Sequence, residues 1–325
     1  MEPHQRGVGF GLVASAKLVG HIFAAMVATS MASQTYAYGI RGWRIAFALI
    51  ALVSLLASFL LSAFMMEPAR DGDAPMTAKT SIAASDSVAA ASSARSPYRS
   101  VCRAECGRVG ALFRIRSFVI IVLQGIFGSC PWSALGFMTM YLQYCGHSDA
   151  VAAAIVSMTH LGGTAGSVLG GLVGDAMARR SPSKGRPLTA VVSVLSGIPS
   201  TYLLICLAMS VDVPLLALLS LCLGLTGTWC GPGVNRPILS EVVDSNGRAS
   251  VIAWLTALEG SSAALFGAPV VGYLAETTFG YVKIDPGVVA SPEIVEANRA
   301  ALKQAMIYCT TLPWAVCACL NMLLC

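Results

Sequence analysis

Charged residues are scarce in this chain, and that scarcity restricts what kind of protein it can be. Only 11% of the 325 residues are Asp, Glu, Lys or Arg, whereas soluble globular domains average about 25%. Hydrophobic residues make up 56% of the chain, and its mean hydropathy is +0.71. Long stretches carry almost no charge, and the short segments between them carry most of it. This pattern excludes a soluble globular domain and predicts a polytopic membrane protein.

The motifs of several functional classes are missing as well. The chain has no phosphate-binding P-loop, no His-x-x-x-His pair and no serine nucleophile elbow. We therefore expect no ATP-driven step, no enzymatic activity, no cofactor and no metal. Most of the eleven cysteines fall within apolar segments, where a thiol packs as a small apolar group. Basic residues are not interleaved with aromatic ones, so the net charge of +5 does not indicate a nucleic-acid partner.

Long apolar segments are abundant. A helix needs roughly 20 mainly apolar residues to cross a bilayer, and eight segments satisfy this length. The predicted transmembrane helices are 7–33, 40–66, 117–144, 150–178, 187–210, 214–240, 249–275 and 303–325. The predicted fold class is an all-α bundle of eight transmembrane helices in contact with the lipid bilayer.

Charge and composition divide this bundle. Lys and Arg are concentrated in the connections on one side, and cytoplasmic loops carry such an excess, so both termini are predicted to be cytoplasmic. Residues 67–116 are rich in Ala, Ser, Asp and Arg, which is typical of a flexible linker. The predicted regions are therefore 1–66 with two helices, a largely disordered cytoplasmic linker at 67–116, and 117–325 with six helices.

The fourth predicted helix has an unusual end. Gly162, Gly166, Gly170 and Gly174 recur every four residues, so they share one slowly drifting helix face on which a neighbouring helix can approach closely. Asp175 and Arg179 follow four residues apart, and each can pair with groups on neighbouring helices. The simpler alternative is that Asp175 and Arg179 only mark the membrane edge.

This end carries a family resemblance. The run Gly171-x-x-x-Asp175-x-x-x-Arg179-Arg180, followed by Gly185-Arg186, resembles the signature loop of the major facilitator superfamily after its eighth helix. Similarity to the fifth, sixth, tenth and eleventh helices of that family is found in the segments 6–11, 42–47, 235–241 and 267–272, the last two as in plant and protist members. The resemblance implies that 117–325 is a complete C-terminal half and that 1–66 holds the last two helices of an N-terminal half.

The resemblance also implies a gating role for charged residues at this membrane face. Asp175 is expected to meet the N-terminal end of the helix that begins near Arg248, where the helix dipole favours an anion. Arg179, next to Arg180, is expected to pair with Glu241. These contacts would latch the cytoplasmic side of the bundle.

The function implied by the resemblance is transport of a small solute by a secondary carrier. Alternating access needs two six-helix bundles, and four helices of the usual twelve are missing before Arg6, so the chain is interpreted as a fragment or a truncated gene product. A natural eight-helix product is the other possibility. The alternative function is a non-transporting membrane scaffold that binds a partner or lipid.

Polar residues at membrane depth are the candidates for a substrate or proton site, because such residues usually face a bundle interior or cavity. Glu259 lies about 15 Å into its helix at 1.5 Å per residue. It could carry a coupling proton, neutralise a cationic substrate, or only tie helices together. Lys17 lies at similar depth and could hold an anionic group. The further candidates, each of which could instead be a packing residue, are His21, His160, Gln124 and Trp132.

The run Gly231-Pro232-Gly233 predicts a break in the sixth helix, because proline lacks an N–H donor and glycine offers little resistance to bending. We interpret this break as a hinge, with passive curvature as the alternative. Arg236 follows near the membrane surface and is interpreted as an interfacial anchor or latch partner.

Overall fold

A computed structural model of the chain describes residues 5–32, 34–36, 39–65, 110, 112–243, 247–284 and 291–325. Helices dominate this described part, which contains no strand and one isolated bridge between Thr35 and Arg41. The all-α class is therefore confirmed. Most of the predicted linker, as well as Cys102 and Cys106 within it, lies outside the described residues.

Eight helical segments of the described chain are long and apolar enough to cross a membrane, as predicted. They are Arg6–Ala24, Gly42–Phe64, Arg116–Tyr144, Asp149–Arg180, Gly185–Leu207, Val213–Val242, Arg248–Thr278 and Pro292–Met322.

Four of these segments are uninterrupted helices in the first unit of the structure, which comprises Met1–Ala46 and Arg116–Cys325. They are α1 (Arg6–Ala32), α6 (Asp149–Arg180), α7 (Gly185–Leu207) and α12 (Pro292–Met322). The second unit, Phe47–Ile115, contains most of α2 (Gly42–Phe64). With a hydropathy of 2.6 over its most apolar window, α2 has the composition of a helix surrounded by lipid.

The other three segments are divided. The first consists of α4 (Arg116–Leu135) and α5 (Met138–Tyr144). The second consists of α8 (Val213–Gly227), the π-helix η4 (Cys230–Asn235) and α9 (Arg236–Val242). The third consists of α10 (Arg248–Ser262), the π-helix η5 (Ala263–Gly267), α11 (Ala268–Tyr273) and the π-helix η6 (Leu274–Thr278). Pro232 lies within η4, and Pro269 is the second residue of α11, directly after the end of η5 and Ala268. Proline has no backbone N–H, so it cannot donate a hydrogen bond within the helix. The wider π turns accommodate the missing hydrogen bonds. The apolar pattern alone did not predict these interruptions.

The last helix begins eleven residues before the predicted boundary at 303. Ser291 caps α12 by accepting a hydrogen bond from the Ile294 N–H, with a donor–acceptor distance of 3.4 Å. Asn298 is buried and exchanges two hydrogen bonds of 2.7 and 2.9 Å with the Val282 backbone. Apolarity marks the part of a helix that lies in lipid, whereas capping decides where the helix starts.

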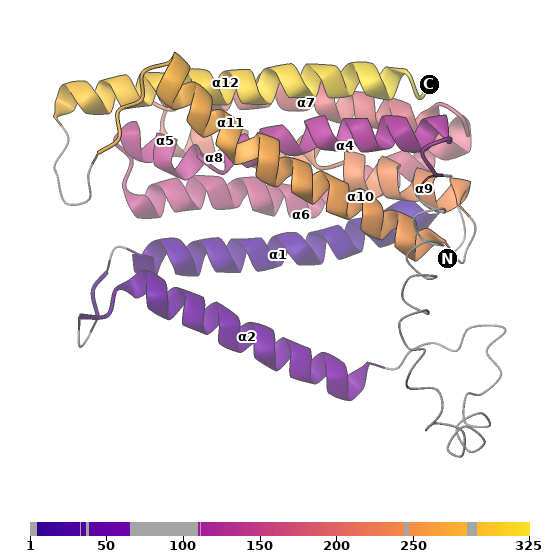
Figure 1. Cartoon of the computed structure of the whole chain (residues 1–325), viewed down its shortest axis with the longest axis horizontal. Coiled ribbons are helices and arrows are strands. Elements are labelled where there is room, and N and C mark those ends of the chain that lie inside the picture. Colours follow the sequence, from indigo (N-terminus) through magenta and orange to yellow (C-terminus); the bar gives the residue numbers. More distant parts are fainter. Residues whose placement is uncertain are drawn as a thin grey trace, which may run out of the picture. The chain divides into compact units, whose positions relative to one another are not determined.

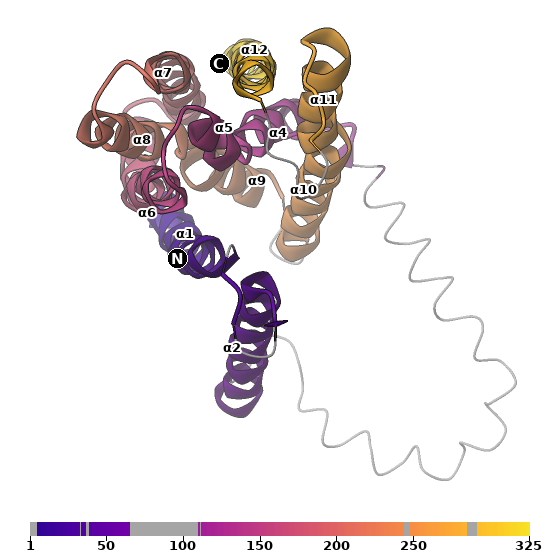
Figure 2. The ribbon, with the colours of Figure 1, turned by 90° about the vertical axis from the view of Figure 1, so that its left-hand side faces the viewer.

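Helix α6 lies between α1 and α8 in the first unit. It packs along α1 on one side and along α8 and η4 on the other, while α12 packs against α4 and α7; Figures 1 and 2 show this arrangement lengthwise and end-on. A Cβ placed on Gly162 would lie 2.0 Å from the Leu221 carbonyl oxygen, and one on Gly174 would lie 2.5 Å from that of Gly233. The predicted close approach along the glycine face is confirmed.

This packing predicts the effect of one methyl group. In Gly162→Ala the new Cβ collides with the α8 backbone, and overpacking of this kind costs roughly 1–3 kcal/mol. Gly272→Ala is the matched control, because a Cβ there meets nothing within 4 Å. We expect the Tm of the purified chain in detergent, followed by tryptophan fluorescence, to fall for Gly162→Ala and to stay or rise for Gly272→Ala. Equal Tm values would contradict the packing of α6 on α8.

Candidate functional site

A buried carboxylate lies where α6 ends. Asp175 is only 2% exposed, and its two carboxylate oxygens accept hydrogen bonds of 3.2 Å from the N–H groups of Gly7 and Val8. These N–H groups belong to the first turn of α1, where amides have no acceptor within their own helix. Asp175 therefore caps α1 and lies at the positive end of its dipole.

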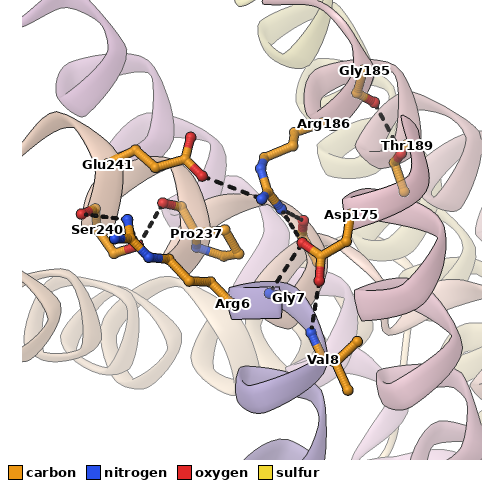
Figure 3. A network of polar contacts seen from close by, with 11 residues as sticks. Arg6, Gly7, Val8, Asp175, Gly185, Arg186, Thr189, Pro237, Ser240 and Glu241 are labelled. Atoms are coloured by element: carbon orange, nitrogen blue, oxygen red, sulfur yellow. Dashed lines mark hydrogen bonds and ion pairs between the residues drawn. The ribbon is translucent and has the colours of Figure 1, made fainter. Parts of the chain in front are cut away.

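Arg186, in the first turn of α7, joins this carboxylate to two other elements. Its guanidinium is 3% exposed, and Nη1 lies 3.0 Å from Asp175 Oδ1. Nη1 also donates to the Gly233 carbonyl at 3.2 Å, and Nη2 donates to Glu241 Oε1 at 3.2 Å. Figure 3 shows the guanidinium lying between the two carboxylates. The planar fork of arginine suits such a bridge better than an ammonium group.

A second arginine ties α1 to α9. Arg6 donates from Nη1 to the Ser240 carbonyl at 3.1 Å, next to Glu241 (Figure 3). We call Arg6, Gly7, Asp175, Arg186 and Glu241 the latch network, and the end of the bundle where they meet the Asp175 end. The network connects α1, α6, α7, η4 and α9.

The partners predicted for this network were wrong in two respects. Asp175 meets the N-terminus of α1, not that of the helix that begins near Arg248. Glu241 pairs with Arg186, whereas Arg179 and Arg180 are exposed. Arg248 donates instead to the Val243 carbonyl at 3.2 Å.

The turn between α6 and α7 explains why Arg186 takes the place expected for Arg179. The Gly185 N–H donates to the Ser181 carbonyl at 2.8 Å, and a Cβ on Gly185 would lie 2.1 Å from the Met177 carbonyl oxygen. This tight return brings the first turn of α7 against the last turns of α6. Gly171 has a similar role toward α1, since a Cβ there would lie 2.4 Å from the Gly7 carbonyl oxygen.

A cavity of about 520 Å³ lies within the first unit, and we call it the central cavity. Residues from α1, α4, α7, α8, η4, α9, α10, η5 and α12 line it. Four of the predicted substrate-site residues meet there, namely Lys17, Gln124, Trp132 and Glu259. Arg236, which the sequence suggested as an interfacial anchor or latch partner, also lines this cavity.

A buried amide pair forms part of the wall. Asn235 Nδ2 donates to Gln124 Oε1 at 2.7 Å, and Cys317 Sγ donates to the Gln124 backbone carbonyl at 3.2 Å. Among the described residues, no hydrogen-bond partner reaches Asn235 Oδ1. Sequence reasoning missed Asn235, although it begins the segment that resembles the tenth helix of the family.

The two histidines lie elsewhere. The His21 and His160 rings pack edge to face, with centroids 5.7 Å apart. His160 lines a smaller cavity of about 240 Å³, to which Trp132 also contributes. The structure thus brings His21 and His160 together outside the lining of the central cavity, although Lys17 still acts electrostatically on His21.

The predicted hinge is the π-helix η4, and it touches both sites. Gly231 lines the central cavity, Pro232 is buried, and the Gly233 carbonyl accepts the hydrogen bond from Arg186. Six residues therefore connect the central cavity to the latch network. In the described part of the chain no three His, Cys, Asp or Glu side chains group as a metal site would require.

Comparisons with known proteins agree with this architecture. A family model described as Major Facilitator Superfamily matches residues 1–268. No curated protein matches the chain.

The solved structures similar to it include two of a bacterial homologue of the human lysosomal transporter Spinster. The inward-facing, occupied form has a TM-score of 0.60 at 14% identity, covering 99% of this chain and 65% of that one. The inward-facing, unoccupied form has a TM-score of 0.59 at 16% identity, covering 98% and 64%. At these identities the likeness shows the fold, and the chain spans slightly less than two thirds of either relative.

The latch network predicts a clear stability ranking. Arg186→Gln leaves the buried Asp175 carboxylate without its cation, and breaking a buried ion pair costs about 3–5 kcal/mol. Arg179→Gln removes the same charge from an exposed position on α6. We expect a large loss of Tm in detergent for Arg186→Gln, partial recovery with Arg186→Lys, and a change within error for Arg179→Gln. A Tm loss for Arg179→Gln as large as that for Arg186→Gln would overturn the assignment of Arg186.

Proposed function

Because this chain belongs to the major facilitator superfamily, we propose that it serves the transmembrane transport of a small solute by alternating access. The observation that carries the proposal is the central cavity, in which Lys17, Arg236 and Glu259 surround a volume of about 520 Å³. Ionisable residues within membrane helices are expensive and usually mark a substrate or ion path. We expect the protein to act as a carrier without enzymatic activity.

The latch network gives the carrier a gate. While it is formed, hydrogen bonds hold α1 against α6 and α9, and one buried ion pair holds α6 against α7. Opening of the Asp175 end would require the Gly7 and Val8 N–H groups to separate from Asp175. Since η4 contacts both Arg186 and the central cavity, solute binding that shifts η4 would change the geometry of the gate. We propose η4 as the hinge of this movement.

Several features remain predictions. The lysine and arginine distribution supports a cytoplasmic Asp175 end with both termini on that side. The division into 1–66, a disordered linker and 117–325 is likewise proposed, as is a eukaryotic origin near plant and protist members. Coverage of 65% and 64% of the two similar structures supports the interpretation that transport requires four further helices before Arg6.

Transport can be measured directly in proteoliposomes. One preparation contains this chain alone, and a second contains the chain joined to an N-terminal four-helix segment, if the genome encodes one upstream. Uptake across a panel of labelled organic anions, cations and neutral solutes is expected in the second preparation only. Absence of uptake in both, with correctly inserted protein, would contradict the carrier function and favour the non-transporting scaffold.

Glu259 is the proposed site of proton coupling, because it is the only carboxylate among the described residues that line the central cavity. In the transporting form, Glu259→Gln removes the titratable group and retains its size. We expect uptake by this variant to lose its pH dependence, whereas Glu276→Gln, on the exposed η6 segment with Lys283 as its partner, should leave it unchanged. An unaltered pH profile in Glu259→Gln would exclude Glu259 as the proton carrier.

A further inference from the structure

The charged side chains of the central cavity are unpaired. Within the described residues, neither hydrogen bonds nor ion pairs shorter than 4 Å engage the head groups of Lys17, Arg236 and Glu259. Elsewhere in the first unit, by contrast, the buried Asp175 and Arg186 neutralise each other at 3.0 Å. Unpaired charge at membrane depth is costly, so a ligand that neutralises it would gain the full interaction.

The balance of charge in the cavity is positive. Two cations face one carboxylate, and both act electrostatically on that carboxylate without a direct contact. Glu259 is held to one side, because Gly125 of α4 has no side chain and a Cβ there would lie 2.5 Å from Glu259 Oε1. The carboxylate thus rests against the α4 backbone and leaves the excess charge of Lys17 and Arg236 for a ligand.

Another part of the wall is aromatic. Trp132 and Trp314 pack edge to face with centroids 6.1 Å apart, and both line the cavity. Trp314 is buried, whereas Trp132 keeps 36% of its surface exposed. A partly open indole in a cavity that also holds charged groups offers a flat apolar surface on which a ring can stack.

We propose that the central cavity binds a small organic acid that carries one negative charge and an aromatic or compact apolar group. Arg236 and Lys17 hold the carboxylate, and Trp132 receives the apolar group. A volume of about 520 Å³ accommodates a ligand of this size. This substrate class rests on the proposed transport function, but it is tested by binding alone.

Three probes of equal size and different charge test the proposal: phenylacetate, phenylacetamide and phenethylamine. Binding of each to the complete purified chain in detergent is measured by titration calorimetry at pH 7. Phenylacetate is expected to bind at least tenfold more tightly than the neutral amide, and the amine should bind most weakly. Tightest binding of phenethylamine, equal binding of all three, or binding of none would overturn the proposal.

Substitutions of the cavity charges should act in opposite directions. Arg236→Gln and Lys17→Gln each remove a cation and should weaken phenylacetate binding about tenfold or more, whereas Glu259→Gln removes the repelling carboxylate and should strengthen it. Arg179→Gln, which removes an exposed arginine outside the central cavity, is the matched control and should bind like the unaltered chain. If Arg236→Gln fails to fold, Lys17→Gln gives an independent reading, because Lys17 is exposed. Weaker binding in Glu259→Gln, or unchanged binding in Lys17→Gln, would contradict the charge argument.

The outcomes separate this proposal from the transport function. Selective binding of phenylacetate by a chain that transports nothing would support the anion site and contradict the carrier function of the chain. Transport of cations or neutral solutes, together with tighter binding of phenethylamine, would support the carrier and overturn the anion site.

Discussion

A carboxylate that is shielded from water must be neutralised, and at the Asp175 end of the bundle this requirement draws four helices and a π-helix together. Asp175 is satisfied by two amides of α1 and by Arg186 of α7. Arg186 in turn reaches Glu241 and the Gly233 carbonyl. Loss of the contact between Asp175 and Arg186 would leave two buried charges unpaired, which is costly.

The short π-helix η4 makes this constraint relevant to the cavity. Gly231 and Asn235 face the central cavity, while Gly233, between them, accepts the hydrogen bond from Arg186. Movement of η4 therefore changes both sites at once. Coupling between a gate and a binding site needs an element whose position both sites bias, and η4 has the contacts for that role.

The apolar pattern was sufficient to predict the eight helices and their order, since residence in lipid demands long apolar runs and backbone hydrogen bonds within each helix. The glycine spacing on α6 also predicted close packing with a neighbour. The start of α12 was placed too late, because Asn298 and the Ser291 cap sustain a helix where apolarity has ended. The partners of the charged residues were predicted poorly: Arg186 was noticed only as part of a motif, although it is the residue that pairs with both Asp175 and Glu241.

The sequence alone thus determined the fold class, the helix count and the family, because these follow from local composition and from a short motif. Only the tertiary structure decided that Asp175 caps α1, that Arg186 replaces Arg179, and that Lys17, Arg236 and Glu259 share one cavity. The reason is physical. Composition constrains each helix separately, whereas the contacts of a side chain depend on how helices rotate and pack, and here that packing is governed by glycines that admit a neighbouring backbone within van der Waals distance.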